Sequence, residues 1–282
     1  MIKSANSNYI SIMRRLYITF SVLLAAFALA GCYHKHSTVY ETDEYGVVTR
    51  INPSEKSVYL VFTAHFSTND NGAFENFDGI VPVLDTLASR GVKGSFFPTG
   101  NCFRVERYKE PIQRIIDEGH YLSAHSNHHL LLCSYANRDS SLVTADSIRT
   151  DIKGMEAELR QFGLTKEQFN WMIPPYEYYN QFSADVLREL GYNLANPTEG
   201  LETSMDWMGP ESPDYCSAQN LVENIWKYDN EHTLSGVILL IHAMNYPDRT
   251  DADRTYLHLG EIIDGIRAGG YDFKTFADIP KQ

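Results

Sequence analysis

The feature that most constrains this sequence is a repeated unit in which an amphipathic helix ends at a glycine and leads into an apolar strand. In one copy, apolar residues fall on one face of a predicted helix over 79–90, Gly91 follows, and residues 92–97 are mostly apolar. Glycine readily takes the left-handed backbone that ends many helices, and this apolar periodicity is typical of a helix. The unit therefore predicts a helix that feeds directly into a buried strand.

Similar units recur along the chain. Helices are predicted over 111–118, from Thr144 to about 162, over 183–190, around 221–228 and around 259–266, and strands over 57–63, 120–125, 192–195, 237–242 and 270–273. Alternating helices and strands indicate a parallel sheet covered by helices. We expect an α/β domain with six or seven parallel strands in a barrel-like sheet. Its functional residues should then lie on loops at the carboxyl ends of the strands.

The first 32 residues are predicted to be an export signal. Basic residues precede an apolar stretch over 16–30, which is short for a membrane span. Leu29-Ala30-Gly31-Cys32 resembles the bacterial lipobox, whose cysteine is lipidated after cleavage. The alternative is a transmembrane anchor with an incidental cysteine. We expect a lipoprotein signal peptide over 1–32, a linker over 33–54 and one domain over 55–282. The protein would be exported and lipid-anchored to a bacterial membrane, in the periplasm or at the cell surface.

Charge and cysteine content narrow the possible partners. The chain has a formal net charge of −12, which does not attract the negatively charged backbone of a nucleic acid. Contact with a membrane should likewise come from the lipid on Cys32 and not from the charge of the domain. Beyond Cys32 the cysteines are Cys102, Cys133 and Cys216, without a CxxC pair. An oxidising compartment allows one disulfide among them, and Cys102–Cys133 is the expected pair.

Two histidines four residues apart follow the predicted strand over 120–125. In His125-Ser126-Asn127-His128-His129, the first and last side chains can converge on one metal ion if the segment turns. Surface histidines are the commoner explanation of such spacing. This pair, however, stands at the end of a buried strand, where barrel enzymes place their sites. The pattern therefore favours metal binding by His125 and His129.

With its neighbours, this segment resembles the second motif of the polysaccharide deacetylases, the NodB-homology group. Other segments resemble further parts of the family pattern in the same order: residues 92–101, Pro174-Pro175-Tyr176, Asp206-Trp207, Val237–His242 and residues 270–273. The resemblance runs from about Lys56 to Ile279 and rests on the ordered set. It implies a distorted (β/α) barrel, a divalent metal that is usually zinc, and hydrolysis of N-acetyl or O-acetyl groups on a glycan.

The resemblance also implies roles for individual residues. His125 and His129 would hold the metal, which would polarise the acetyl carbonyl and acidify its water. The backbone N–H of Tyr176 would help to bind the oxyanion. His242 would protonate the departing group.

The first and third motifs depart from the family pattern. Thr63 and Ala64 occupy the positions of two aspartates, one a base and one a metal ligand, and Ile173 replaces an arginine that supports the base. These losses are mutually consistent, because an arginine without its carboxylate would be an unpaired buried charge.

Other side chains offer replacements for the missing aspartates. Either His65 or Asp70 could be the third metal ligand, and imidazole suits zinc. Glu177, where the motif usually has glycine, could act as the base, although a solvated loop acid explains it equally well. His120 and His128 are expected to be structural or exposed. The aromatic residues near the third motif, Trp171, Tyr176, Tyr178 and Tyr179, suit either a glycan groove or buried packing.

Three functions fit these observations. The leading hypothesis is a metal-dependent hydrolase that removes acetyl groups from an acetylated glycan outside the cytoplasm. The retained histidines favour this enzyme, whereas the lost aspartates favour a non-catalytic protein that binds glycan on the same barrel. Metal-dependent amide hydrolysis on a non-sugar substrate has similar site chemistry.

Overall fold

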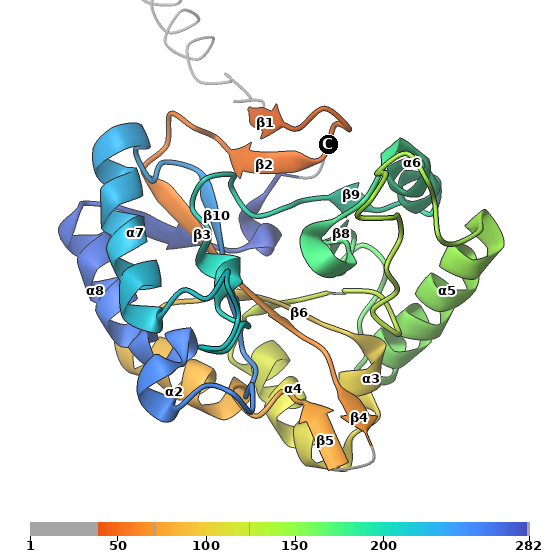
Figure 1. Cartoon of the computed structure of the whole chain (residues 1–282), viewed down its shortest axis with the longest axis horizontal. Coiled ribbons are helices and arrows are strands. Elements are labelled where there is room, and N and C mark those ends of the chain that lie inside the picture. The colour runs from red at the N-terminus through yellow and green to blue at the C-terminus, as the bar shows by residue number, and fades with distance from the viewer. Residues whose placement is uncertain (1–38, 70–71, 124, 281–282) are drawn as a thin grey trace, which may run out of the picture. The chain divides into compact units, whose positions relative to one another are not determined.

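A curved sheet made largely of parallel strands runs through the middle of the folded domain (Figure 1). The computed structural model of the chain describes residues 39–69, 72–123 and 125–280. The central strand is β3 (Ser57–Ala64), which pairs in parallel with β10 (Val237–His242) on one side. On its other side, β11 (Asp272–Lys274) pairs with the first half of β3 and β6 (Ser95–Pro98) with the second half. Strand β7 (Tyr121–Leu122) extends the sheet beyond β6.

Two further parallel strands, β8 (Trp171–Met172) and β9 (Asn193–Leu194), form a separate pair. Between β7 and β8, side chains replace the backbone ladder: the Ser123 hydroxyl donates to the Trp171 carbonyl, and the Trp171 N–H donates to the Tyr121 hydroxyl. A parallel bridge from Val48 to Ala195 connects β9 back to the main sheet. The structure confirms the predicted distorted (β/α) barrel, with seven strands in parallel pairs within the described residues.

Helices surround the sheet on its outer side (Figure 1). They are α2 (Ile80–Arg90), α3 (Gly100–Phe103), α4 (Lys109–Asp117), α5 (Ala145–Gln161), α6 (Gln181–Glu189), α7 (Ala218–His232) and α8 (Leu259–Ala268). The predicted start of α5 at Thr144 is confirmed, because the Thr144 side chain caps the helix and accepts a hydrogen bond from the Ser147 N–H at 3.1 Å. Gly91 ends α2 with a left-handed φ of 59°, as the repeated unit predicts. At its start α2 has Gly79 as the N-cap, without a side-chain hydrogen bond, and the carboxylate of the preceding Asp78 binds Arg107 and Tyr108.

The core has two layers, one on each face of the sheet. All eight residues of β3 are buried, and they alternate between the layers. Leu60 and Phe62 pack towards the helices, whereas Tyr59 and Val61 pack inside the barrel with Phe276. Burial on both faces explains why β3 is a continuous apolar run in the sequence.

The expected linker over 33–54 is wrong for residues 39–54, because the folded domain starts earlier. Strands β1 (Tyr40–Thr42) and β2 (Val48–Ile51) form an antiparallel hairpin, and β2 pairs with β10. Val47 and Ile51 are fully buried, and Arg50 donates to the Ser235 carbonyl at 2.8 Å. The segment has too few apolar residues to show a strand-like alternation in the sequence. It nevertheless extends the sheet beyond β10. Among the described residues, no helix is both long and apolar enough to cross a membrane.

The disulfide expected between Cys102 and Cys133 is also wrong. In the part of the chain that the structure describes, both of these buried thiols are free. The thiol of Cys216, which is partly exposed, is also free. Cys102 lies on α3, where its Sγ is 3.7 Å from the Thr99 hydroxyl and 3.8 Å from the Ala64 carbonyl oxygen. Burial raises the pKa of the Cys102 thiol to about 12. The thiol therefore packs as a small apolar group against the end of β3.

Candidate active site

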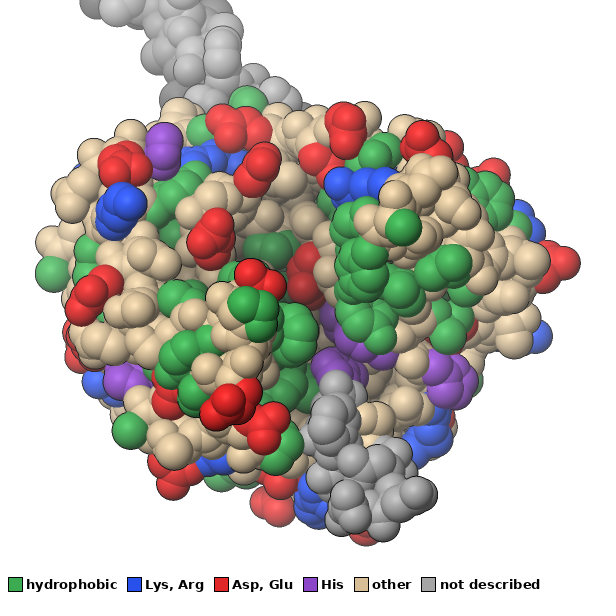
Figure 2. Space-filling view, in the orientation of Figure 1, with side chains coloured by type: hydrophobic (Ala, Val, Ile, Leu, Met, Phe, Trp, Pro, Cys, Tyr) green, Lys and Arg blue, Asp and Glu red, His purple; other side chains and the backbone are tan. Residues whose placement is uncertain are grey.

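The candidate active site lies where neighbouring parallel strands end. His242 is the last residue of β10 and pairs in register with Thr63 near the end of β3, and His65 follows that strand directly. His125 comes three residues after β7, and the short 3₁₀ turn η2 (Pro175–Glu177) follows β8. Figure 2 shows histidine side chains at the edge of a hollow in this face, beside a wall of hydrophobic side chains. The strand ends thus bring the predicted residues together, as expected for a barrel.

Three histidines form a compact cluster in this site. The ring centroids of His65 and His129 are 4.2 Å apart with the rings nearly parallel, and those of His125 and His129 are 5.0 Å apart. Burial lowers the pKa of His125 to about 3, and it lowers the pKa of His129 well below its ordinary value. The imidazoles of His125 and His129 are therefore neutral, which is the form that binds metals.

The hydrogen bonding of His125 fixes which nitrogen faces the site. Its Nδ1 is 2.8 Å from the carbonyl oxygen of Ile173, and a carbonyl only accepts, so Nδ1 carries the proton. The lone pair of the neutral ring is then on Nε2, which lies 3.7 Å from Oε1 of Glu177. Metal-binding histidines commonly donate their second N–H to a backbone carbonyl in this way.

Glu177, whose side chain is 19% exposed, presents its carboxylate to the cluster. Its Oε1 is inaccessible to solvent and has no hydrogen-bond partner among the described residues. Burial raises the pKa of Glu177 to about 7, a shift that nearby His242 opposes and Asp206 reinforces. Both Tyr176 and Glu177 have left-handed backbones, with φ of 61° and 52°. Such backbone strain in residues other than glycine is concentrated at functional sites.

His242 has a partner whose role the sequence did not reveal. Nδ1 of His242 lies 2.6 Å from Oδ1 of Asp206, and the His242 backbone N–H donates to Oδ2 of the same carboxylate at 3.0 Å. Both residues are buried. Because the carboxylate accepts, it orients the ring with Nδ1 as donor. The Asp206-Trp207 pair was visible as a motif, but nothing in the sequence connected it with His242.

The positions of the missing family aspartates and arginine are filled by buried, uncharged side chains. Thr63 and Ala64 are completely buried at the end of β3, and Oγ1 of Thr63 has no hydrogen-bond partner in the described part of the chain. Ile173 is also completely buried, inside the barrel. An arginine at that position would lack a carboxylate at Thr63 or Ala64 to pair with.

Several predicted residues lie elsewhere or are not described. Asp70 and Cys32 are outside the described residues. His120 is structural as predicted: it is buried, and its Nδ1 accepts from the Gly94 N–H at 3.1 Å. The His128 side chain is mostly exposed. Across residues 39–69, 72–123 and 125–280, no three His, Cys, Asp or Glu side chains are arranged to hold a metal ion as they stand.

Comparison with known families agrees with this architecture. Residues 50–195, just over half of the chain, match the family model described as polysaccharide deacetylase. The chain belongs to the polysaccharide deacetylase family. This match and the related deacetylases support a hydrolase of the polysaccharide deacetylase type, a class that acts on carbon–nitrogen bonds other than peptide bonds.

Individual deacetylases are similar over most of the chain. The peptidoglycan-N-acetylmuramic acid deacetylase PdaA of Bacillus subtilis is 28% identical over 232 residues, which cover 81% of this chain and 73% of that protein. The peptidoglycan-N-acetylglucosamine deacetylase of Bacillus cereus is 25% identical over 197 residues, covering 70% and 79%. A solved family 4 carbohydrate esterase pseudoenzyme from Bacillus anthracis shares the fold, with a TM-score of 0.61, 16% identity and coverage of 84% and 69%.

Proposed function

We propose that this deacetylase family member removes acetyl groups from an acetylated glycan by metal-dependent hydrolysis. The observation that carries the proposal is the convergence of His65, His125 and His129 with the carboxylate of Glu177. The relatives described above act on peptidoglycan, so an N-acetylated glycan is the first substrate to test. An O-acetylated glycan has the same reacting carbonyl and is the second.

The donor set of the cluster suits a divalent cation. His125 and His129 are neutral, and His125 already donates its Nδ1–H to a carbonyl, which leaves Nε2 for an ion. Imidazoles are common zinc ligands. We assign the third ligand to His65, whose ring stacks on His129, with Asp70 as the alternative. The stacked rings must reorient when an ion binds. A bound cation would polarise the acetyl carbonyl and lower the pKa of the attacking water.

Glu177 is the proposed general base. Its raised pKa of about 7 lies close to neutral pH, where a base is most effective. Its Oε1 is buried near His125, so it would take a proton from a water molecule in the site without a competing protein hydrogen bond. Glu177 would thus replace the carboxylate that Thr63 and Ala64 do not supply.

The two remaining roles concern charge on the substrate. Tyr176 directly precedes Glu177 and has a left-handed backbone, and we assign its N–H to the oxyanion that would form on the acetyl carbonyl. His242, oriented by Asp206, would protonate the departing nitrogen or oxygen. Glu177, which follows β8, would then remove a proton, and His242, at the end of β10, would deliver one.

Exposed aromatic rings would bind the glycan around the reacting group. The Tyr176 side chain is 42% exposed, and its ring lies 4.2 Å from that of His129. Tyr178 is partly exposed and packs against Tyr135, with the ring centroids 4.9 Å apart. Trp171 and Tyr179 are buried and serve packing instead. Tyr176 and Tyr178 are therefore our candidates for contact with sugar rings.

The protein would work at a bacterial membrane surface. A lipid on Cys32 would anchor the domain in the periplasm or at the cell surface, within reach of extracytoplasmic glycans. We expect no nucleic-acid partner, because a net charge of −12 repels the phosphate backbone.

Product analysis tests this proposal. The full-length protein, purified in detergent and supplied with Zn²⁺, is incubated with chitin oligosaccharides, peptidoglycan fragments and O-acetylated xylan, and acetate and new amino groups are measured. Release of acetate that is lost in His125→Ala supports the proposal. Glycan binding without acetate release from any of the three would instead identify the non-catalytic binding protein.

A further inference from the structure

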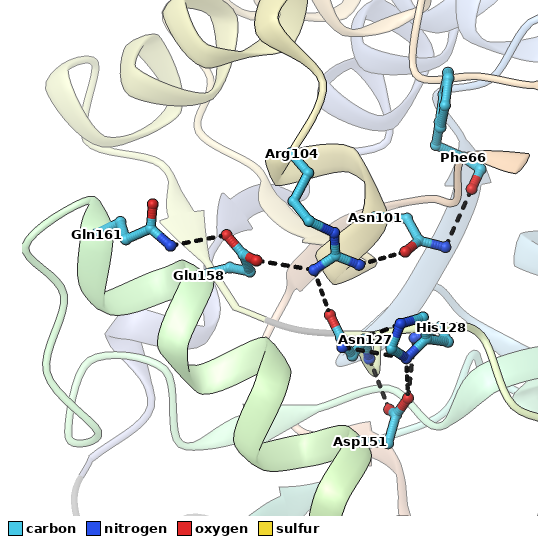
Figure 3. Close-up of polar contacts among 8 residues, drawn as sticks. All are labelled: Phe66, Asn101, Arg104, Asn127, His128, Asp151, Glu158 and Gln161. Carbon is cyan, nitrogen blue, oxygen red and sulfur yellow. Dashed lines mark hydrogen bonds and ion pairs between the residues drawn. The ribbon is translucent and has the colours of Figure 1, made fainter.

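The segment between His125 and His129 is hydrogen-bonded to the buried carboxylate of Asp151 on helix α5 (Figure 3). Oδ2 of Asp151 accepts from the Asn127 N–H at 2.7 Å, and Oδ1 accepts from the His128 N–H at 3.1 Å. Oδ1 also lies 2.9 Å from Nδ1 of His128. Asp151 is 4% exposed, and its bond to the Asn127 N–H is buried, whereas its two contacts with His128 are partly buried. Both carboxylate oxygens are thus used on the turn that separates the two histidines.

The side chain of Asn127 lies in a slot between two glycines. A Cβ on Gly100 would be 2.0 Å from Oδ1 of Asn127, and a Cβ on Gly154 would be 2.5 Å from its Nδ2. Oδ1 accepts from Nη1 of Arg104 at 2.9 Å. Helices α3 and α5 therefore each provide a glycine where this amide needs the space.

Helix α3 connects the same turn to the segment that carries His65. The Gly100 and Asn101 N–H groups donate to the carbonyls of Ser126 and Asn127 at 3.0 and 3.1 Å. Arg104 also donates to the Asn101 side chain, whose Nδ2 donates to the carbonyl of Phe66 at 3.3 Å (Figure 3). Phe66 directly follows His65. One network thus spans both segments of the histidine cluster.

The turn needs such support because its backbone is strained. Ser126 and His129 have left-handed φ of 69° and 56°. Residues other than glycine keep this conformation only where their surroundings hold it. Without the contacts to Asp151 and Asn127, the turn would relax, and the rings of His125 and His129 would move apart.

We propose that Asp151 and Asn127 are positioning residues that hold the histidine-bearing turn in its metal-binding shape, an inference that rests on the proposed metal site. Neither residue is assigned to the ion or the substrate. Their effect on the site passes through the backbone between His125 and His129. Outer-shell residues of this kind typically change metal affinity by about 10- to 100-fold.

The test compares two Asp→Asn substitutions on the same helix. Asp151→Asn places an amide NH₂ where the carboxylate accepts, so at least one backbone bond is lost. Asp146→Asn, at an almost fully exposed side chain of α5, is the matched control. Zn²⁺ affinity of full-length, metal-free protein is measured by competition titration. We expect affinity about 10- to 100-fold weaker in Asp151→Asn and within about twofold of wild type in the control.

A second readout does not depend on metal. Hydrogen exchange at the Asn127 and His128 amides of metal-free protein should be about 10-fold faster or more in Asp151→Asn, and unchanged in Asp146→Asn. If Asp151→Asn does not fold, Gly154→Ala is measured instead, since its Cβ displaces the Asn127 amide. Unchanged exchange in a folded variant overturns the inference. If wild type binds no Zn²⁺, the metal proposal fails, and exchange alone decides the positioning role.

Discussion

Oε1 of Glu177 lies 3.7 Å from Nε2 of His125, so the carboxylate nominated as base sits beside a nominated metal ligand. This proximity requires the two roles to be separated by experiment. Glu177→Gln keeps the shape and removes the basicity, and it should lower turnover by ~10²–10⁴-fold. Metal content should not change, because a base is not a ligand.

Metal analysis and acetate release on the same preparation check this prediction. Glu167→Gln, which makes the same change at an exposed acid outside the cluster, is the control. A large loss of Zn²⁺ in Glu177→Gln would show that the carboxylate binds the ion. Near wild-type turnover would show that it is not the base, and Asp70 would be examined next.

Asp206→Asn should slow the reaction through His242. The carboxylate accepts from both the ring and the backbone N–H of His242, so its loss leaves the ring poorly oriented. We expect turnover to fall by up to ~10²–10⁴-fold. His242→Ala should have a similar effect, greatest for amine leaving groups. The double variant should be no slower than the slower single variant, because the residues act as a unit. Additive losses in steady-state kinetics would contradict this coupling.

Replacing His125 or His129 with alanine should weaken Zn²⁺ binding by orders of magnitude, because two protein ligands hold an ion far less well than three. His65→Ala distinguishes the candidates for the third ligand. Comparable weakening by His65→Ala assigns that position to His65, whereas little change, together with weakening by Asp70→Ala, assigns it to Asp70. Isothermal titration of metal-free protein provides the affinities, with the exposed His232→Ala as control.

Cys32→Ser should abolish lipidation. Wild-type protein should enter the detergent phase of a phase-separated extract, and the variant should remain in the aqueous phase. If the variant enters the detergent phase like wild type, the segment is a transmembrane anchor and the lipoprotein interpretation fails.

The fold could be predicted because its signals are local. Glycines at the ends of amphipathic helices, such as Gly91, and a cap such as Thr144 depend on neighbouring residues. The continuous apolar runs over 57–63 and 237–242 became the two longest strands of the described sheet, β3 and β10. The histidine cluster was predictable for the same reason, since parallel strands bring their carboxyl ends to one edge.

Features that depend on distant contacts could not be predicted. The hairpin of β1 and β2 is stable because β2 pairs with Val237 of β10, far along the chain. The separate pairing of β8 with β9 follows from side chains such as Ser123 and Tyr121 that take up the adjacent backbone groups. Likewise, the hydrogen bond between Asp206 and His242 joins a loop to a strand, and no local sequence pattern predicts it.

The most direct test of the account is acetate release by one preparation before and after its metal is removed. Full-length protein loaded with Zn²⁺ is incubated with N-acetylated peptidoglycan fragments, then stripped with a chelator, and finally reloaded. The account predicts acetate release that is lost on stripping and restored by Zn²⁺, and that is absent throughout in His125→Ala. Acetate release that continues unchanged in the stripped protein, or that never occurs in the loaded one, would contradict it.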